Sequence, residues 1–233
     1  MKQIALVGTT LSRLKAPYDD PSWVIWSHAC AHALRGMPGK RIDRWFELHT
    51  PTVRREPKTW DAKYPEWLAR TDRAPIMLQQ ADPTIPGSVT HPRADVEAWA
   101  TARGLLPNGP YFTSTLSWMI LQALYEGADH IGIWGCNFSQ TEEYRVQRPC
   151  AEYWIAAARA LGVPVTIAST SPLGKSRHVY GYDGHRKDLL RDSPLKPVPL
   201  MIAREGAELP PLQAIPPEVQ AMIDQQKEMY EFR

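Results

Sequence analysis

Two side chains at the end of an apolar segment have the chemistry of an acid–base pair. Glu47 and His49 are two residues apart, and alternation along an extended strand places both on the same side of a sheet. A carboxylate beside an imidazole can orient the ring and tune it as a general base. The alternative interpretation is an ion pair that orders a loop. Glu47 and His49 are therefore candidate catalytic residues.

A third candidate catalytic residue is Arg148, which follows Tyr144 at helical spacing. This spacing favours a clamp in which the guanidinium and the phenol hold the oxygens of one phosphate. Such a cation would stabilise a leaving phosphate. Glu152 lies one helical turn beyond Arg148, so an i,i+4 ion pair is the competing interpretation.

Polar residues also gather directly after several apolar runs. Gly8 lets the backbone approach a ligand closely, and the hydroxyls and backbone N–H groups that follow it suit an anion. The turn matches neither GxGxxG nor a P-loop, and an ordinary turn capped by hydroxyls explains the same residues. The candidate nucleotide-binding residues at these positions are Gly8, Thr9, Thr10, Ser12, Ser27, His28, Asn137 and Tyr144.

Three consecutive hydroxyl residues, Thr113, Ser114 and Thr115, open the strongest helical pattern in the chain. Hydroxyls and free N–H groups at a helix N-terminus form a pocket for an anion or a carboxylate. Simple N-capping is the alternative, and it needs only one of the three. These residues are the candidate substrate-binding group.

The elements that must position these residues alternate along the chain. Short apolar runs predict strands at 2–7, 23–26, 44–48, 75–78, 131–134 and 163–168, and helical periodicity predicts helices at 11–15, 59–71, 93–103, 113–126, 142–161 and 217–232. This order implies βαβ crossovers, so the fold class is α/β, a Rossmann-like parallel sheet flanked by helices. In such sheets ligands bind beyond the carboxyl ends of the strands, where the polar clusters lie.

Length, composition and charge limit the kinds of protein that this sequence can encode. The 233 residues suit a nucleotide-binding domain at 1–190 followed by a Pro-rich segment and a C-terminal helix at 191–233, packed on its own domain or on a second copy of the chain. A net charge of +2 without a basic run does not indicate nucleic acid. Three cysteines without CxxC spacing argue against a disulfide framework and a zinc site. No run approaches the roughly 18 apolar residues of a membrane span, and the default location is the cytoplasm.

One region resembles a known group of families. Tyr111–Phe112–Thr113–Ser114–Thr115, an apolar helix, and then GADHIGIWGCNF at 127–138 resemble bacterial CMP-sialic acid-dependent sialyltransferases, motility accessory factors and archaeal hydroxymethylpterin diphosphokinases. The segments VGTTLS at 7–12 and FELHTP at 46–51 resemble the first and third strand ends of those families. The chain also looks like small proteins encoded by tailed phages and prophages, which would place it in the host cytoplasm.

The resemblance implies roles for the same residues. Gly8, Thr9, Ser12 and Asn137 would cradle a nucleotide, while Ser27, His28 and His49 reach its base and ribose. Thr113 to Thr115 would meet the transferred group, and Tyr144 or Arg148 the phosphates. His178 and His185 are further candidate bases by position.

We therefore expect a glycosyltransferase-like enzyme that uses a CMP- or nucleoside diphosphate-sugar donor, with the nucleotide as substrate. No residue is assigned to a metal, and Mg²⁺ is left open as a cofactor. One alternative is a phage accessory protein that binds or sequesters a nucleotide without turnover. Another is (pyro)phosphoryl transfer from ATP, which would require Mg²⁺.

Overall fold

The chain folds around one parallel β-sheet with helices on both faces. The computed structural model describes residues 1–28, 31–55, 63–138, 143–176, 179 and 182. Residues Met1–Leu173 belong to one compact unit, and a second unit begins at Gly174. The strands are β1 (Gln3–Val7), β2 (Trp23–His28), β3 (Arg44–Glu47), β4 (Ile76–Leu78), β5 (Ser88–Thr90), β6 (His130–Trp134) and β7 (Val165–Ile167). The helices are η1 (Leu11–Lys15), η2 (Ala31–Ala33), α1 (Pro51–Arg55), α2 (Tyr64–Leu68), α3 (Arg93–Thr101), α4 (Thr115–Tyr125), η3 (Glu143–Gln147) and α5 (Arg148–Ala160).

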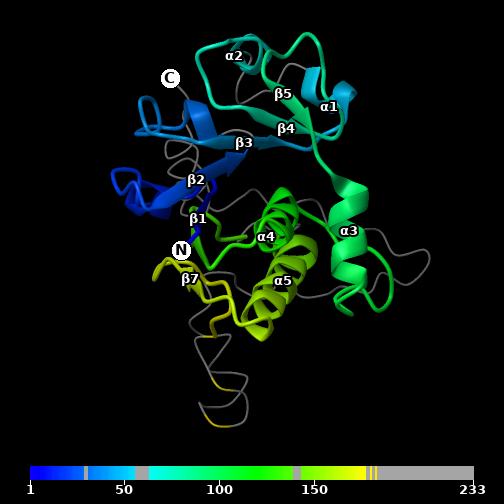
Figure 1. Ribbon diagram of the computed structural model, residues 1–233. Coiled ribbons are helices and arrows are strands. Elements are labelled where there is room, and N and C mark those ends of the chain that lie inside the picture. Colours follow the sequence, from blue (N-terminus) through cyan, green and yellow to red (C-terminus); the bar gives the residue numbers. More distant parts are fainter. Residues whose placement is uncertain (29–30, 56–62, 139–142, 177–178, 180–181, 183–233) are drawn as a thin grey trace, which may run out of the picture. The chain divides into compact units, whose positions relative to one another are not determined.

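The strand order is β5-β4-β3-β2-β1-β6-β7, and every neighbouring pair is parallel. The chain builds the sheet outward from β1 to β5 and then returns to place β6 on the other side of β1 (Figure 1). This reversal makes the carboxyl ends of β1 and β6 the topological switch point, where ligands bind in open α/β sheets. The Rossmann-like α/β fold predicted from the sequence is confirmed.

Alternation along the strands divides the core between the two faces of the sheet. Ile4 and Leu6 of β1 pack into a cluster with residues of α3, α4 and α5. Ala5 and Val7 pack on the other face, in a cluster with Tyr64 and other residues contributed by the short helices and loops. Burial of both faces explains why β1 reads as an unbroken apolar run. The alternation along each strand therefore determines on which face of the sheet the side chain of the next residue lies.

Some elements differ from the sequence expectation. Neither β5 nor α1 was predicted from the sequence. The segment that forms β5 is short, lies between Gly87 and Pro92, and pairs at the edge of the sheet with Val89 exposed. The helix predicted at 59–71 is limited to Tyr64–Leu68 among the described residues. Pro149 lies in the first turn of α5, so the single helix predicted at 142–161 is divided into η3 and α5 among the described residues.

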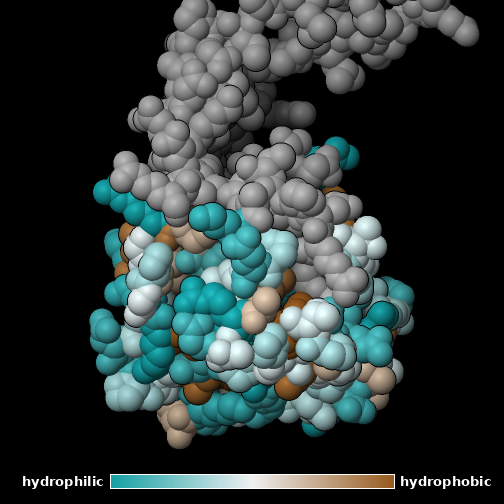
Figure 2. Space-filling view, turned by 90° about the horizontal axis from the view of Figure 1, so that it is seen from above, coloured by the Kyte–Doolittle hydropathy of each residue, from teal (hydrophilic) through white to brown (hydrophobic). Residues whose placement is uncertain are grey.

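The predicted C-terminal helix at 217–232 lies outside the described residues. Within the part of the chain that is described, no helix is both long enough and apolar enough to span a bilayer. The described surface seen in Figure 2 is mainly hydrophilic, with apolar residues scattered across it.

Candidate functional site

The loops that follow β1 and β6 cross each other at two glycines. The Gly8 amide donates to the Trp134 carbonyl at 2.8 Å, and the Thr10 amide donates to the Gly135 carbonyl at 2.8 Å. A Cβ on Gly8 would lie 2.5 Å from the Gly135 oxygen, and one on Gly135 would lie 2.7 Å from the Gly8 oxygen. The sequence predicted that Gly8 allows a close approach by a ligand. In the structure the close approach is made by the backbone of the neighbouring loop.

Two side chains brace this crossing from within. The Ser12 hydroxyl is buried and accepts a hydrogen bond from the Gly135 amide at 2.8 Å. Arg13 is 4% exposed, and its guanidinium donates to the Thr9 and Arg35 carbonyls at 2.8 Å each. Ser12, predicted to bind the nucleotide directly, thus positions the loop in the described geometry. Arg13, which the sequence reasoning did not select, fixes the same turn.

Two buried polar atoms at this strand end have no hydrogen-bond partner in the described residues. They are Oγ1 of Thr10, after β1, and Oδ1 of Asn137, after β6. Buried polar atoms are paired in the great majority of cases, and an exception in a native fold is commonly explained by an unseen water or ligand. Both residues were predicted from the sequence to face the nucleotide. Their unpaired oxygens are the feature expected of that role.

The backbone after Asn137 is also unusual. Phe138 has φ 48°, which makes it a non-glycine residue in the left-handed region. Such a conformation costs on the order of 1–3 kcal/mol and is concentrated at functional sites. The strained residue therefore lies next to one of the two unpaired oxygens.

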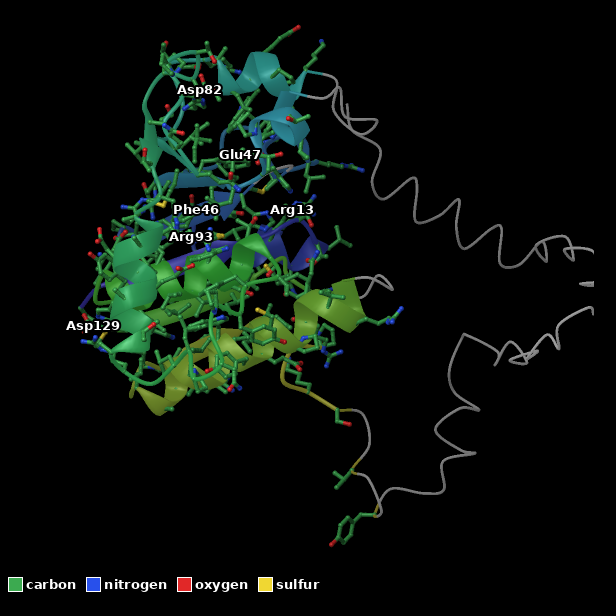
Figure 3. All side chains as sticks on the ribbon, turned by 90° about the vertical axis from the view of Figure 1, so that its right-hand side faces the viewer. Arg13, Phe46, Glu47, Asp82, Arg93 and Asp129 are labelled. Carbon is green, nitrogen blue, oxygen red and sulfur yellow. The ribbon has the colours of Figure 1, made fainter. Side chains whose placement is uncertain are left out.

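Glu47 and His49 form the pair predicted at the third strand end. The Glu47 carboxylate is 1% exposed; its Oε1 lies 2.6 Å from His49 Nδ1 and accepts from the His49 amide at 3.0 Å. Its Oε2 accepts from the Tyr64 hydroxyl at 2.5 Å. The Tyr64 oxygen accepts in turn from Trp45 Nε1 at 3.2 Å. The imidazole, whose side chain is 51% exposed, is thus held by a buried network through Glu47, which is labelled in Figure 3.

Burial of Glu47 would by itself raise its pKa. The hydrogen bonds and positive charge of His49 and the hydrogen bond from Tyr64 outweigh burial, so the pKa of Glu47 is lowered. The carboxylate is therefore ionised at neutral pH and can orient the imidazole and stabilise it when it takes a proton. The contact that the sequence predicted is confirmed, while catalysis by this pair stays a prediction.

Ser27 and His28, predicted together at the base and ribose, point to opposite faces of the sheet. Ser27 pairs with Val7, is fully buried, and donates its hydroxyl to the Val7 carbonyl at 2.9 Å. This bond joins β1 to β2 and leaves no exposed hydroxyl for a ligand. His28 pairs with Phe46 and so lies on the face covered by α3, α4 and α5. The period-two alternation of a strand is the reason for the separation.

The three hydroxyls before and within the first turn of α4 have separate tasks. Ser114 is the N-cap, and its oxygen accepts from the Ser117 amide at 3.3 Å. Thr113 donates to the Val146 carbonyl at 2.9 Å and so ties α4 to the segment before α5. Thr115 is the first residue of the helix. The N-capping alternative is confirmed for Ser114, and substrate binding by the three residues stays a prediction.

Arg148 makes the ion pair that competed with phosphate binding in the sequence analysis. Its Nε donates to Glu152 at 2.8 Å, and its Nη2 donates to the Pro172 carbonyl at 2.8 Å. Next to Pro172, the buried Ser171 hydroxyl donates to the Cys136 carbonyl at 2.8 Å. Arg148 thereby ties the loop after β7 to α5, while Ser171 ties the same loop to the end of β6. Its role at a phosphate stays a prediction.

Some predicted residues cannot be placed. Tyr144 belongs to η3, but its side chain lies outside the described part, as do His178 and His185. Among the residues that are described, no group of three or more His, Cys, Asp or Glu is arranged to hold a metal ion.

A cavity of about 430 Å³ lies beside the ends of β3 and β4 and was not predicted from the sequence. Its lining residues are Leu48, Gln79, His91, Arg93, Pro110, Phe112 and Trp118. Trp118 of α4 is only partly buried and lines this cavity. His91 and Arg93 were not predicted as site residues, because the strand that precedes them was not predicted either. The imidazole and the guanidinium on either side of Pro92 were the available signal.

His91 gives a pH prediction. Burial, opposed by Glu97 and reinforced by Arg93, lowers the pKa of His91 to about 4. The unfolded chain, with an ordinary histidine pKa near 6.5, then binds the proton more readily than the folded chain as pH falls below 6.5. We expect the free energy of unfolding to drop by about 2 kcal/mol between pH 6.5 and pH 4. Urea unfolding at several pH values should show this loss for the natural chain and a smaller one for His91→Gln. Equal losses would contradict the assignment.

Comparisons with known proteins give structural likenesses only. No protein-family model matches the chain, and neither does any curated protein. A structure of the sialyltransferase CstII from Campylobacter jejuni with CMP aligns at TM-score 0.45 and 14% identity, covering 73% of this chain and 81% of that one. A second, with CMP-3FNeuAc, aligns at TM-score 0.45 and 12% identity, covering 72% and 80%. A sialyltransferase CST-II complex with a trisaccharide acceptor and CMP aligns at TM-score 0.45 and 13% identity, covering 76% and 89%. At these values no residue of the chain is assigned a role from the likenesses.

Proposed function

We propose that the chain binds a nucleotide where β1 and β6 end and transfers a sugar from that nucleotide to an acceptor hydroxyl. The observation that carries the proposal is the pair of buried oxygens of Thr10 and Asn137 at the topological switch point, neither of which has a hydrogen-bond partner among the described residues. A nucleotide carries amino and hydroxyl groups that can donate to such oxygens. The strained backbone at Phe138 and the crossing of Gly8 and Gly135 fix the two loops that present them.

The proposed roles follow from the contacts. Thr9, Thr10 and Asn137 face the nucleotide, and Gly8 and Ser12 fix the loops that carry them. His49 removes the proton from the acceptor hydroxyl, while Glu47 orients the ring through the 2.6 Å contact and stabilises the imidazolium that forms. The bond from the acceptor oxygen to the sugar forms as the bond from the sugar to the phosphate breaks, and the phosphate leaves with the electron pair.

The first test is binding. Titration calorimetry with CMP, CDP, UDP, GDP, ADP and ATP, with and without Mg²⁺, should give heat with at least one nucleotide. Thr10→Val keeps the shape of the side chain and removes the hydroxyl, so we expect it to weaken binding about tenfold. Thr166→Val is the matched control, because Thr166 lies on β7 and bonds to His130 at 2.9 Å. No binding by any nucleotide, or equal losses in both variants, would overturn the site.

The second test is turnover. Release of the free nucleotide from CMP- and nucleoside diphosphate-sugars, measured with the nucleotide class found by calorimetry, should proceed in the natural chain. Binding without turnover of any donor would favour the sequestering protein. Binding of ATP that needs Mg²⁺, with transfer of phosphate, would replace glycosyl transfer by phosphoryl transfer. Either result would contradict the proposed reaction while leaving the nucleotide site intact.

A further inference from the structure

The cavity of about 430 Å³ next to the ends of β3 and β4 is a second place where a ligand fits. Its volume is within the range of roughly 300–1,000 Å³ found for small-molecule sites. Leu48 and Phe112 pack against the core cluster that includes residues of α3, α4 and α5, so the cavity opens on that side of the sheet. Glu47 points to the other side, toward Tyr64. The cavity is therefore distinct from the buried network beneath His49.

One wall of the cavity is aromatic and apolar. The rings of Phe112 and Trp118 stack at 3.7 Å, and both side chains keep part of their surface exposed. Phe112 also stacks on Trp154 at 5.0 Å, so it presents its edge to the cavity. Leu48 and Pro110 extend the apolar lining. An apolar wall of this kind suits the C–H face of a ring rather than a small ion alone.

The rest of the lining is polar. The Arg93 guanidinium lies 5.9 Å from the Trp118 ring, and its side chain is 67% exposed. Its Nε donates to Glu97 at 2.8 Å. Its two terminal nitrogens make no hydrogen bond within the described chain. The side-chain N–H of Gln79 donates a hydrogen bond to the Leu48 carbonyl at 2.8 Å, which leaves the Gln79 side-chain oxygen as an acceptor. Arg93 thus offers a two-pronged donor to an anion.

His91 completes the polar lining. Its backbone amide donates to the Leu78 carbonyl at 2.7 Å, and its ring meets Trp118 edge to face at 5.1 Å. The residue is 95% buried, and its Nε2 has no hydrogen-bond partner among the described residues. Because the pKa of His91 is lowered to about 4, the ring is neutral at pH 7 and can donate or accept a hydrogen bond.

We propose that this cavity binds a sugar-sized ring that carries an anionic group. The ring lies against the exposed part of Trp118 and the edge of Phe112, its hydroxyls reach Gln79 and His91, and its phosphate or carboxylate accepts hydrogen bonds from the terminal nitrogens of Arg93. The amphipathic lining fits a sugar, which has an apolar face and a hydroxyl edge. The inference stands without the proposed nucleotide site, because none of these residues takes part in it.

The test compares ligands that carry both a sugar ring and an anionic group with ligands that carry only one of the two. The full chain is titrated by calorimetry with glucose 6-phosphate, glucuronate, glucose and inorganic phosphate, without nucleotide. We expect at least one of the two anionic sugars to bind at least tenfold more tightly than both glucose and inorganic phosphate. The two anionic sugars distinguish a phosphate from a carboxylate. If neither exceeds the simple probes tenfold, the proposal is overturned, whether or not nucleotides bind.

Variants locate the binding. Arg93→Gln should weaken binding of the anionic sugar at least tenfold, as expected for a lost charged hydrogen bond. Arg103→Gln is the matched control, since the Arg103 guanidinium lies over Trp99 at 4.0 Å and does not line the cavity. The indole N–H signal of Trp118, assigned in the NMR spectrum with Trp118→Phe, should shift on titration. Equal affinities of the two arginine variants, or a fixed Trp118 signal, would contradict the site.

Discussion

Replacing Gly135 by alanine is expected to lower the free energy of unfolding by about 2–4 kcal/mol. Gly135 has φ +72°, a conformation that alanine adopts at a cost of about 1 kcal/mol. In addition, the new Cβ would lie 2.7 Å from the Gly8 oxygen and 2.8 Å from its carbonyl carbon. Neither atom can move without opening the crossing that carries Thr10. The loss is a large part of the ~5–15 kcal/mol that stabilises a typical domain.

Gly162→Ala provides the matched control for this prediction. Gly162 has φ +81°, but a Cβ there would meet nothing within 4 Å. The free energy of unfolding of Gly162→Ala should therefore fall only by the cost of the backbone conformation, about 1 kcal/mol. Urea unfolding followed by the fluorescence of the nine tryptophans measures both values. An equal loss of stability in Gly135→Ala and Gly162→Ala would contradict the close approach of the two loops.

The second large effect concerns His49. In the proposed transfer reaction, His49→Ala removes the general base, and we expect kcat to fall by a factor of about 10²–10⁴. Nucleotide affinity should change less than about threefold, because the proposed nucleotide contacts come from Thr10 and Asn137. Steady-state kinetics together with calorimetry on the same variant separate the two quantities.

The control for His49 is another imidazole on the same sheet. His130 begins β6, at the opposite edge from the strand ends, and its Nε2 lies 2.9 Å from the Thr166 hydroxyl. His130→Ala should leave kcat within about twofold of the natural value. Glu47→Gln removes the negative charge while keeping the size of the side chain, and kcat should fall by about tenfold or more as the imidazolium loses its partner. A loss of affinity that matches the loss of kcat in His49→Ala would assign His49 to binding instead.

The sequence by itself determined the class of fold and one local contact. Unbroken apolar runs alternating with helical periods dictated a parallel sheet covered on both faces, because only burial on both sides makes such runs stable in water. The pairing of Glu47 with His49 was also readable, since two residues along an extended strand return to the same face. N-capping by Ser114 and the pairing of Arg148 with Glu152 were likewise local and were among the stated alternatives.

Only the tertiary structure decided which of these residues meet. The crossing of Gly8 with Gly135 joins segments more than 120 residues apart and turns a supposed ligand contact into packing of backbone on backbone. Ser27 and His28 are neighbours in sequence, but their strand places them on opposite faces. The cavity at His91 and Arg93 exists because the short edge strand β5 pairs with β4 and brings them beside Gln79 at the end of β4 and Trp118 of α4. Such contacts depend on strand order and register, which arise from packing across the whole sheet and leave no periodic signal in any one segment.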